Sequence, residues 1–220
     1  MPVPVSVDAQ IRRLEKHVRE LQNLRTEVGE EVSVLVAEIC NASMLLLDKA
    51  MNAIWAAKAQ PSNGKKKPHV YFPVCESERK FFDRLRQYQM PSLKETDGEL
   101  FALLEAVQPY RGTTWLPQAH KIAVLRHEYF PEISTTQTSG LGIGKGQNLY
   151  IESMTIGGSG NINFKGEATN RKTGAAEPLR VDFILEVKSM IEAVGAEPVP
   201  FCKTVVSAVR KLAKDIYRVI

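Results

Sequence analysis

Residues 29–59 read GEEVSVLVAEICNASMLLLDKAMNAIWAAKA, a segment far more apolar than the helix-like sequence before it. Large apolar side chains recur here at steps of three and four residues, which is the spacing of one face of an α-helix. They are Val32, Leu35, Val36, Ile39, Met44, Leu47, Met51, Ile54 and Trp55. The segment is therefore predicted to be a long helix at the centre of the core.

Four more helices are predicted around this segment, all before Pro131. The first follows Asp8, a good N-cap, and carries one apolar stripe made of Ile11, Leu14, Val18, Leu21, Leu24 and Val28. The others cover 77–88, which Ser77 can cap, 95–107 and 114–130, and prolines at 109 and 131 end the last two. The stripe of the first helix also suits a coiled-coil seam, so this helix is a candidate for self-association.

Beyond residue 131 the apolar period changes from 3.6 to 2, which is typical of half-buried strands. The sequences LYIESMTI, NINFKGEAT and LRVDFILEV alternate in this way and are separated by turn-forming residues. The last 20 residues have helical periodicity again. The predicted fold class is α+β: an N-terminal helical bundle, then a small antiparallel β-meander covered by a C-terminal helix. We place the boundary after residue 131, giving parts 1–131 and 132–220 that pack as one unit.

Composition indicates a folded protein that is not strongly charged. The chain has 220 residues, of which 44% are hydrophobic and 25% charged, and a net charge of +4, which is mild for a nucleic-acid binder. Its three cysteines are far apart and show no C-x-x-C pair, so we expect reduced thiols and neither a disulfide framework nor a cysteine zinc site. No signal peptide and no long apolar run is evident, which predicts a cytoplasmic protein without membrane contact.

Two motifs that suggest cofactors fail on physical grounds. The glycine-rich stretch at 139–148 has Ser139 where a phosphate-binding loop needs glycine and Gly146 where it needs serine or threonine, so we interpret it as a connection between domains. His120 and His127 are seven residues apart, about 10 Å along a helix, which is wrong for shared zinc chelation. We expect no cofactor and no metal.

Basic residues on the last helix, Arg210, Lys214 and Arg218, could contact phosphates, but Asp215 interrupts them. Nucleic acid is therefore a weakly supported partner. Arg12 and His17 have the R-x4-H spacing of HEPN-type ribonucleases, although a solvated helix face explains the pair better.

The order of four short patterns resembles a family of uncharacterised bacterial proteins. In that family a long helix ends in N-x-R-S-x-L-D-H, a Phe-Pro segment follows, and then come QPY, a turn and a helix ending in D-K-H. The counterparts here are NASMLLLDKA, YFPV, QPYRG and LRHE, and the likeness spans residues 29–130. Met44 replaces the family's arginine and Leu125 its last aspartate, so the charged constellation is only half present.

The resemblance implies one polar cluster, in which Asp48 faces Arg126 or His127. Asp48 lies in an apolar helix, and an isolated buried carboxylate is costly, so it is expected to have a partner in this cluster. The candidate site residues are Asp48, His120, Arg126 and His127. The absence of a complete catalytic set favours a non-enzymatic binding or self-associating protein. The alternative is a HEPN-like, metal-independent ribonuclease or phosphodiesterase that uses His127 with Arg126 or His120.

Overall fold

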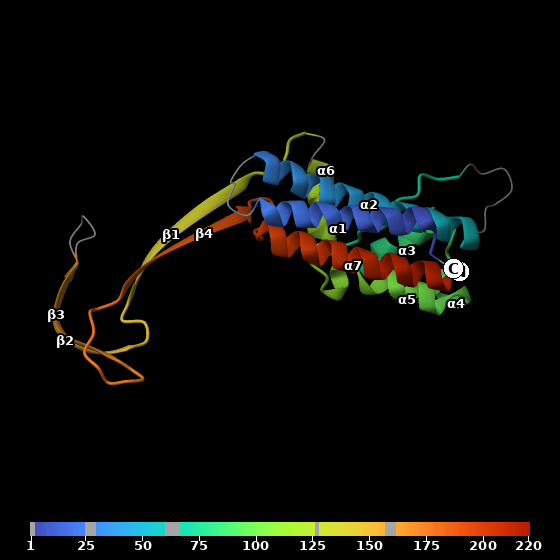
Figure 1. Ribbon diagram of the computed structural model, residues 1–220. Coiled ribbons are helices and arrows are strands. Elements are labelled where there is room, and N and C mark those ends of the chain that lie inside the picture. Colours follow the sequence, from blue (N-terminus) through green and yellow to red (C-terminus); the bar gives the residue numbers. More distant parts are fainter. Residues whose placement is uncertain (1–2, 25–29, 60–66, 126–127, 157–161) are drawn as a thin grey trace. The chain divides into compact units, whose positions relative to one another are not determined.

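The computed structural model describes residues 3–24, 30–59, 67–125, 128–156 and 162–220 (Figure 1). The chain divides into two compact units, residues 1–135 with 189–220, and residues 136–188. The first unit is helical and the second consists of strands and turns. The α+β class, with helices before and after antiparallel strands, is confirmed. In the described part of the chain, no helix has the length and apolar character needed to cross a bilayer.

The helical unit is built around α2 (Glu30–Lys58), as the apolar pattern predicts. It packs against α1 (Val5–Asn23), α6 (Trp115–Leu125) and α7 (Pro198–Val219). Figure 1 shows α1, α2 and α7 running side by side. In the described part of the α1 stripe, Ile11, Leu14, Val18 and Leu21 are buried and Leu24 is half-buried, and Val7 extends the buried face toward the start of the helix. Self-association through α1 stays a prediction, and the stripe that suggested it is already covered.

The last helix has packing partners that the sequence did not predict. Besides α1 and α2, α7 contacts α5 (Gly98–Ala106) and α6, and it belongs to the same compact unit as these helices. The prediction placed it over the apolar side of the sheet, within residues 132–220. An apolar stripe shows that a helix is covered on one face, but it does not show which surface covers it.

Capping residues determine where two of the shorter helices begin. Ser77 accepts a hydrogen bond from the Lys80 amide (3.3 Å) and caps α3 (Glu78–Gln87), as predicted. The helix predicted over 95–107 is instead two helices, α4 (Leu93–Thr96) and α5. They are divided at Asp97, whose carboxylate accepts from the Leu100 amide (3.1 Å). The first helix begins at Val5, before the predicted cap.

The strands form two nested pairs and not a meander. The inner pair, β2 (Gln147–Ile156) with β3 (Ile162–Asn170), is antiparallel and has an irregularity between Ile151 and Ser153. The outer pair is β1 (Ile133–Ile143) with β4 (Val181–Ile191). The Glu192 amide donates to the Glu132 carbonyl at one end of this pair, and the Gly144 amide donates to the Arg180 carbonyl at the other end. The start of β1 therefore lies beside the end of β4, so the two strands are antiparallel. The glycine-rich stretch, predicted as a connection, ends β1 and turns into β2.

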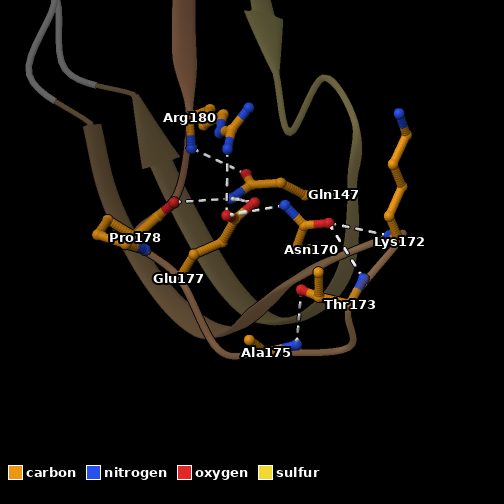
Figure 2. A network of polar contacts seen from close by, with 8 residues as sticks. All are labelled: Gln147, Asn170, Lys172, Thr173, Ala175, Glu177, Pro178 and Arg180. Carbon is orange, nitrogen blue, oxygen red and sulfur yellow. Dashed lines mark hydrogen bonds and ion pairs between the residues drawn. The ribbon is translucent and has the colours of Figure 1, made fainter.

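A polar network joins the β1–β2 turn to the segment between β3 and β4 (Figure 2). Gln147, only 1% exposed, donates to Glu177 (3.0 Å) and to the Pro178 carbonyl (2.7 Å) and accepts from the Arg180 amide (2.9 Å). Glu177 also accepts from Asn170 (3.3 Å) and Arg180 (3.1 Å). Side-chain hydrogen bonds therefore hold the β1–β2 turn and the β3–β4 segment together at the end of the strands, where backbone pairing stops.

Candidate functional site

An extended segment at residues 70–75 runs through the helical unit without joining a sheet, and α2 satisfies part of its backbone. The Phe72 amide donates to Asp48 Oδ1 (2.7 Å), and Asn52 Nδ2 donates to the Val70 carbonyl (2.9 Å). Asp48 and Asn52 lie one turn apart, so one face of α2 presents both groups. The Phe-Pro segment is therefore bonded to the central helix by side chains.

Residues beyond α3 and α5 bind the same segment from elsewhere. The hydroxyl of Tyr88 accepts from the Tyr71 amide (3.3 Å). Gln108 is fully buried, and it accepts from the Cys75 amide (3.0 Å) while donating to the Pro73 carbonyl (3.1 Å). An amide side chain offers one acceptor and two donors, so it can replace a neighbouring strand for one residue.

The end of this segment forms one wall of an open cleft with a volume of about 890 Å³. The other walls come from α3, from the start of the 3-10 turn η1 (Pro109–Arg111) and from α6. The lining combines charged, polar and apolar side chains: Val74, Cys75, Glu76, Lys80, Asp83, Arg84, Gln87, Pro109, Pro117 and His120. This volume lies in the range of ligand-binding sites, whereas the lining is more polar than that of most such sites.

The charges that line the cleft are not all neutralised. Lys80 is paired with Glu76 (2.7 Å), and Asp83 is paired with Arg86 (3.1 Å), which lies outside the lining. Arg84 forms no ion pair with any carboxylate in the described part of the chain. Its guanidinium lies 5.9 Å from the centre of the Tyr88 ring. Arg84 is exposed, and among the described residues it is the one cation of the cleft that pairs with no carboxylate.

The pKa values of two titratable groups, Cys75 and Asp48, are shifted in and beside the cleft. Burial raises the pKa of the Cys75 thiol, and the nearby charges of Arg84 and Lys80 oppose the rise. Burial also raises the pKa of Asp48, against the opposing effects of the Phe72 hydrogen bond and of the His120 charge. A buried thiol with a raised pKa is a poor nucleophile, so Cys75 serves here as a wall of the cleft.

The structure brings together two of the four predicted site residues. Asp48 is half-buried behind the extended segment, and His120 is exposed at the cleft, close enough to influence the Asp48 carboxyl. Arg126 and His127 lie outside the described residues, so their predicted contact with Asp48 stays a prediction. The partner found for Asp48 is the Phe72 amide.

Sequence reasoning missed the two residues that define the site most clearly. It noted Gln108 only as part of the QPYRG pattern, whereas its side chain binds the extended segment. Arg84 was not singled out, because an arginine on an amphipathic helix is usually solvated. The position of Gln108 directly before a proline in QPY was the one available signal for the first.

Other expected partners find less support in the described residues. On α7, Arg210 is paired with Glu15 (2.9 Å) and Lys211 with Asp215 (3.0 Å), so part of the basic face is neutralised. Arg12 is exposed and His17 half-buried on α1. No group of three or more metal-ligating side chains occurs among the described residues.

Comparisons of the chain with protein-family models, with curated proteins and with solved structures find no match. The resemblance to the bacterial family with the QPY pattern therefore stays a prediction.

Proposed function

We propose that this is a non-enzymatic cytoplasmic binding protein whose cleft in the helical unit receives an anionic group of its partner. The cytoplasm is proposed because the three cysteines, Cys40, Cys75 and Cys202, are buried free thiols, the form that reducing compartments maintain.

The observation that carries the proposal is the unbalanced charge of Arg84. Every other full charge lining the cleft has an ion-pair partner: Lys80 has Glu76, and Asp83 has Arg86. A guanidinium presents its donors in a planar fork that matches carboxylate or phosphate oxygens. An anion bound there would gain charge-assisted hydrogen bonds without breaking an existing pair.

The test measures binding of three anionic probes by isothermal titration calorimetry: a pool of glutamate-centred pentapeptides, a single-stranded RNA oligonucleotide and inorganic phosphate. At least one probe should bind, and Arg84→Gln should weaken its binding about tenfold or more, because a hydrogen bond to a charged group contributes about 1.5–3 kcal/mol.

Arg79→Gln is the matched control, since Arg79 is on the same helix, is 93% exposed and does not line the cleft, and its contact with Asp83 is long at 4.0 Å. Equal binding of every probe to wild type and Arg84→Gln would contradict the proposal.

One observation favours the alternative function, a HEPN-like metal-independent ribonuclease or phosphodiesterase. His120 and Arg84 line the same cleft, and an imidazole with a guanidinium is a combination that can transfer protons and stabilise phosphate charge. Incubation with an RNA that carries a fluorophore and a quencher separates the two functions. The binding proposal expects no cleavage, whereas cleavage that His120→Ala abolishes would favour the enzyme.

A further inference from the structure

The extended segment at 70–75 has two backbone edges that are satisfied by different elements. In an extended chain the N–H and C=O groups of successive residues point to opposite edges. One edge carries the groups of residues 71, 73 and 75, which bond to Tyr88 and Gln108. The other carries the groups of residues 70 and 72, which bond to Asn52 and Asp48. The bonds alternate along the segment as an extended strand requires.

Val74 is the next residue on the second edge, and this position is open. Neither its N–H nor its C=O makes a hydrogen bond in the described part of the chain, although Val74 lines the cleft. Gln108 bonds to the residues before and after it, Pro73 and Cys75, so the groups of Val74 point away from Gln108. The Val74 backbone is therefore unpaired among the described residues, and Val74 belongs to the lining that α3 and α6 share.

We propose that the cleft binds a short extended peptide with an acidic side chain, whose backbone pairs with Val74 and whose carboxylate binds Arg84. This inference rests on the proposed binding function and names the class of its ligand. Addition of a peptide strand to an open backbone edge is a common mode of recognition.

A peptide fits the open position better than a phosphate or a nucleic-acid backbone does. Val74 presents one donor and one acceptor, and a peptide backbone has one of each for every residue. A phosphate group without a proton only accepts, so it would leave the Val74 carbonyl without a partner. The prolines at 109 and 117, which also line the cleft, add apolar surface for the flanking side chains.

The experiment uses the full chain and end-capped pentapeptide pools that differ only at the centre, with glutamate in one pool and lysine in the other. Titration calorimetry should show the glutamate pool binding about tenfold or more tightly, a preference that Arg84→Gln removes and Arg79→Gln retains. N-methylation of the peptide backbone beside the glutamate should weaken binding to a similar extent, because it removes the donor to the Val74 carbonyl.

Amide hydrogen exchange gives a readout that needs no variant. The Val74 N–H should exchange more slowly when the glutamate pool is bound, and Val74→Pro, which removes this donor, should weaken binding while thermal unfolding confirms that the variant is folded. If Val74→Pro does not fold, the protection of the Val74 amide in the wild type decides the question.

Three outcomes would overturn the proposal of a peptide ligand: equal binding of the two pools, no effect of N-methylation, or no slowing of hydrogen exchange at the Val74 amide. If RNA or inorganic phosphate binds in a way that depends on Arg84 and the peptides do not bind, the peptide proposal is wrong and the proposal of an anion-binding cleft is retained. If no probe binds in a way that depends on Arg84, both proposals are wrong.

Discussion

Gln108 is a fully buried amide whose hydrogen bonds connect the extended segment at 70–75 to α5. Besides the bonds to Pro73 and Cys75, its Nε2 donates to the Leu104 carbonyl (2.9 Å). The side-chain oxygen therefore accepts one hydrogen bond, and both N–H groups of Nε2 donate one each. A buried polar group is tolerated when it is satisfied in this way, and its removal leaves its partners unsatisfied.

We expect Gln108→Leu to lower the free energy of unfolding by about 1–3 kcal/mol for each buried backbone group that loses its partner. Gln108→Glu keeps the shape and the bond to the Cys75 amide, but an ionised carboxylate would face the Pro73 and Leu104 carbonyls. Burial beside acceptors raises the pKa of such a carboxyl, so this variant should be less stable at neutral than at acidic pH. Denaturant unfolding at several pH values measures both, and equal pH dependence of the two variants would contradict this arrangement.

Asp48 gives a second prediction at the residue scale. Asp48→Ala should cost about 1–3 kcal/mol, because the buried Phe72 amide loses its acceptor, whereas Asp48→Asn keeps an acceptor oxygen and should cost less. A loss below about 1 kcal/mol for the alanine variant would mean that Asp48 behaves as a surface residue.

The pH dependence of Asp48 has a defined sign. Its folded-state pKa is raised, so the folded protein holds this proton more tightly than the unfolded chain does. The free energy of unfolding therefore falls as pH rises from the ordinary aspartate pKa to the raised one, and then stays level. Asp48→Asn cannot lose a proton, so its stability relative to wild type should increase across this window. Denaturant midpoints measured across the window check the sign, and a relative decrease would show the pKa to be lowered.

At the scale of elements, periodicity located helices and strands more reliably than it located their ends. The predicted helix over 95–107 contains a break that its apolar pattern does not show. Asp97 causes this break, since its side chain caps α5 and also pairs with Lys58 of α2 at 2.8 Å. A cap is visible in sequence only as a residue type, and the distant lysine that reinforces it is not visible at all.

The inner hairpin depends on a glycine that sits against the neighbouring strand. A Cβ at Gly166 would collide with the Tyr150 carbonyl oxygen and approach Ile151 Cα to 3.1 Å. Gly166→Ala should therefore disrupt the pairing of β2 with β3, seen as faster amide exchange along both strands. Gly174→Ala is the matched control, because Gly174 also has a positive φ of 70° but nothing within 4 Å of an added Cβ. Similar exchange in the two variants would contradict the close approach at Gly166.

At the scale of the whole molecule, the helical unit is interrupted in sequence by the strand unit. Its core is made of residues before 136 and after 188, and α7 completes it by packing on α1 and α2. The Glu132–Glu192 hydrogen bond makes Ser134 and Met190, two residues further along each strand, the next hydrogen-bonded pair. A two-residue turn can join positions that are paired in this way.

Replacement of residues 135–189 by Asn-Gly, which joins the Ser134/Met190 pair, should therefore leave a folded helical unit. Its helical circular dichroism should be retained and should be lost in one cooperative thermal transition, as expected of a unit with its own core. Loss of cooperativity would show that the strand unit is needed for the helical core.

The sequence alone determined the α+β class, the central helix at 30–58, the cap at Ser77 and the alternation of the strands, because these depend on neighbours a few residues apart. Only the tertiary structure decided that α7 packs on helices, that the strands are nested, and that Arg84 has no carboxylate partner among the residues it describes. It also decided how the extended segment is satisfied, since its side-chain partners lie 17 to 35 residues away along the chain. A local pattern shows that a face or a backbone group needs a partner, whereas the choice among distant partners depends on how all the elements pack together.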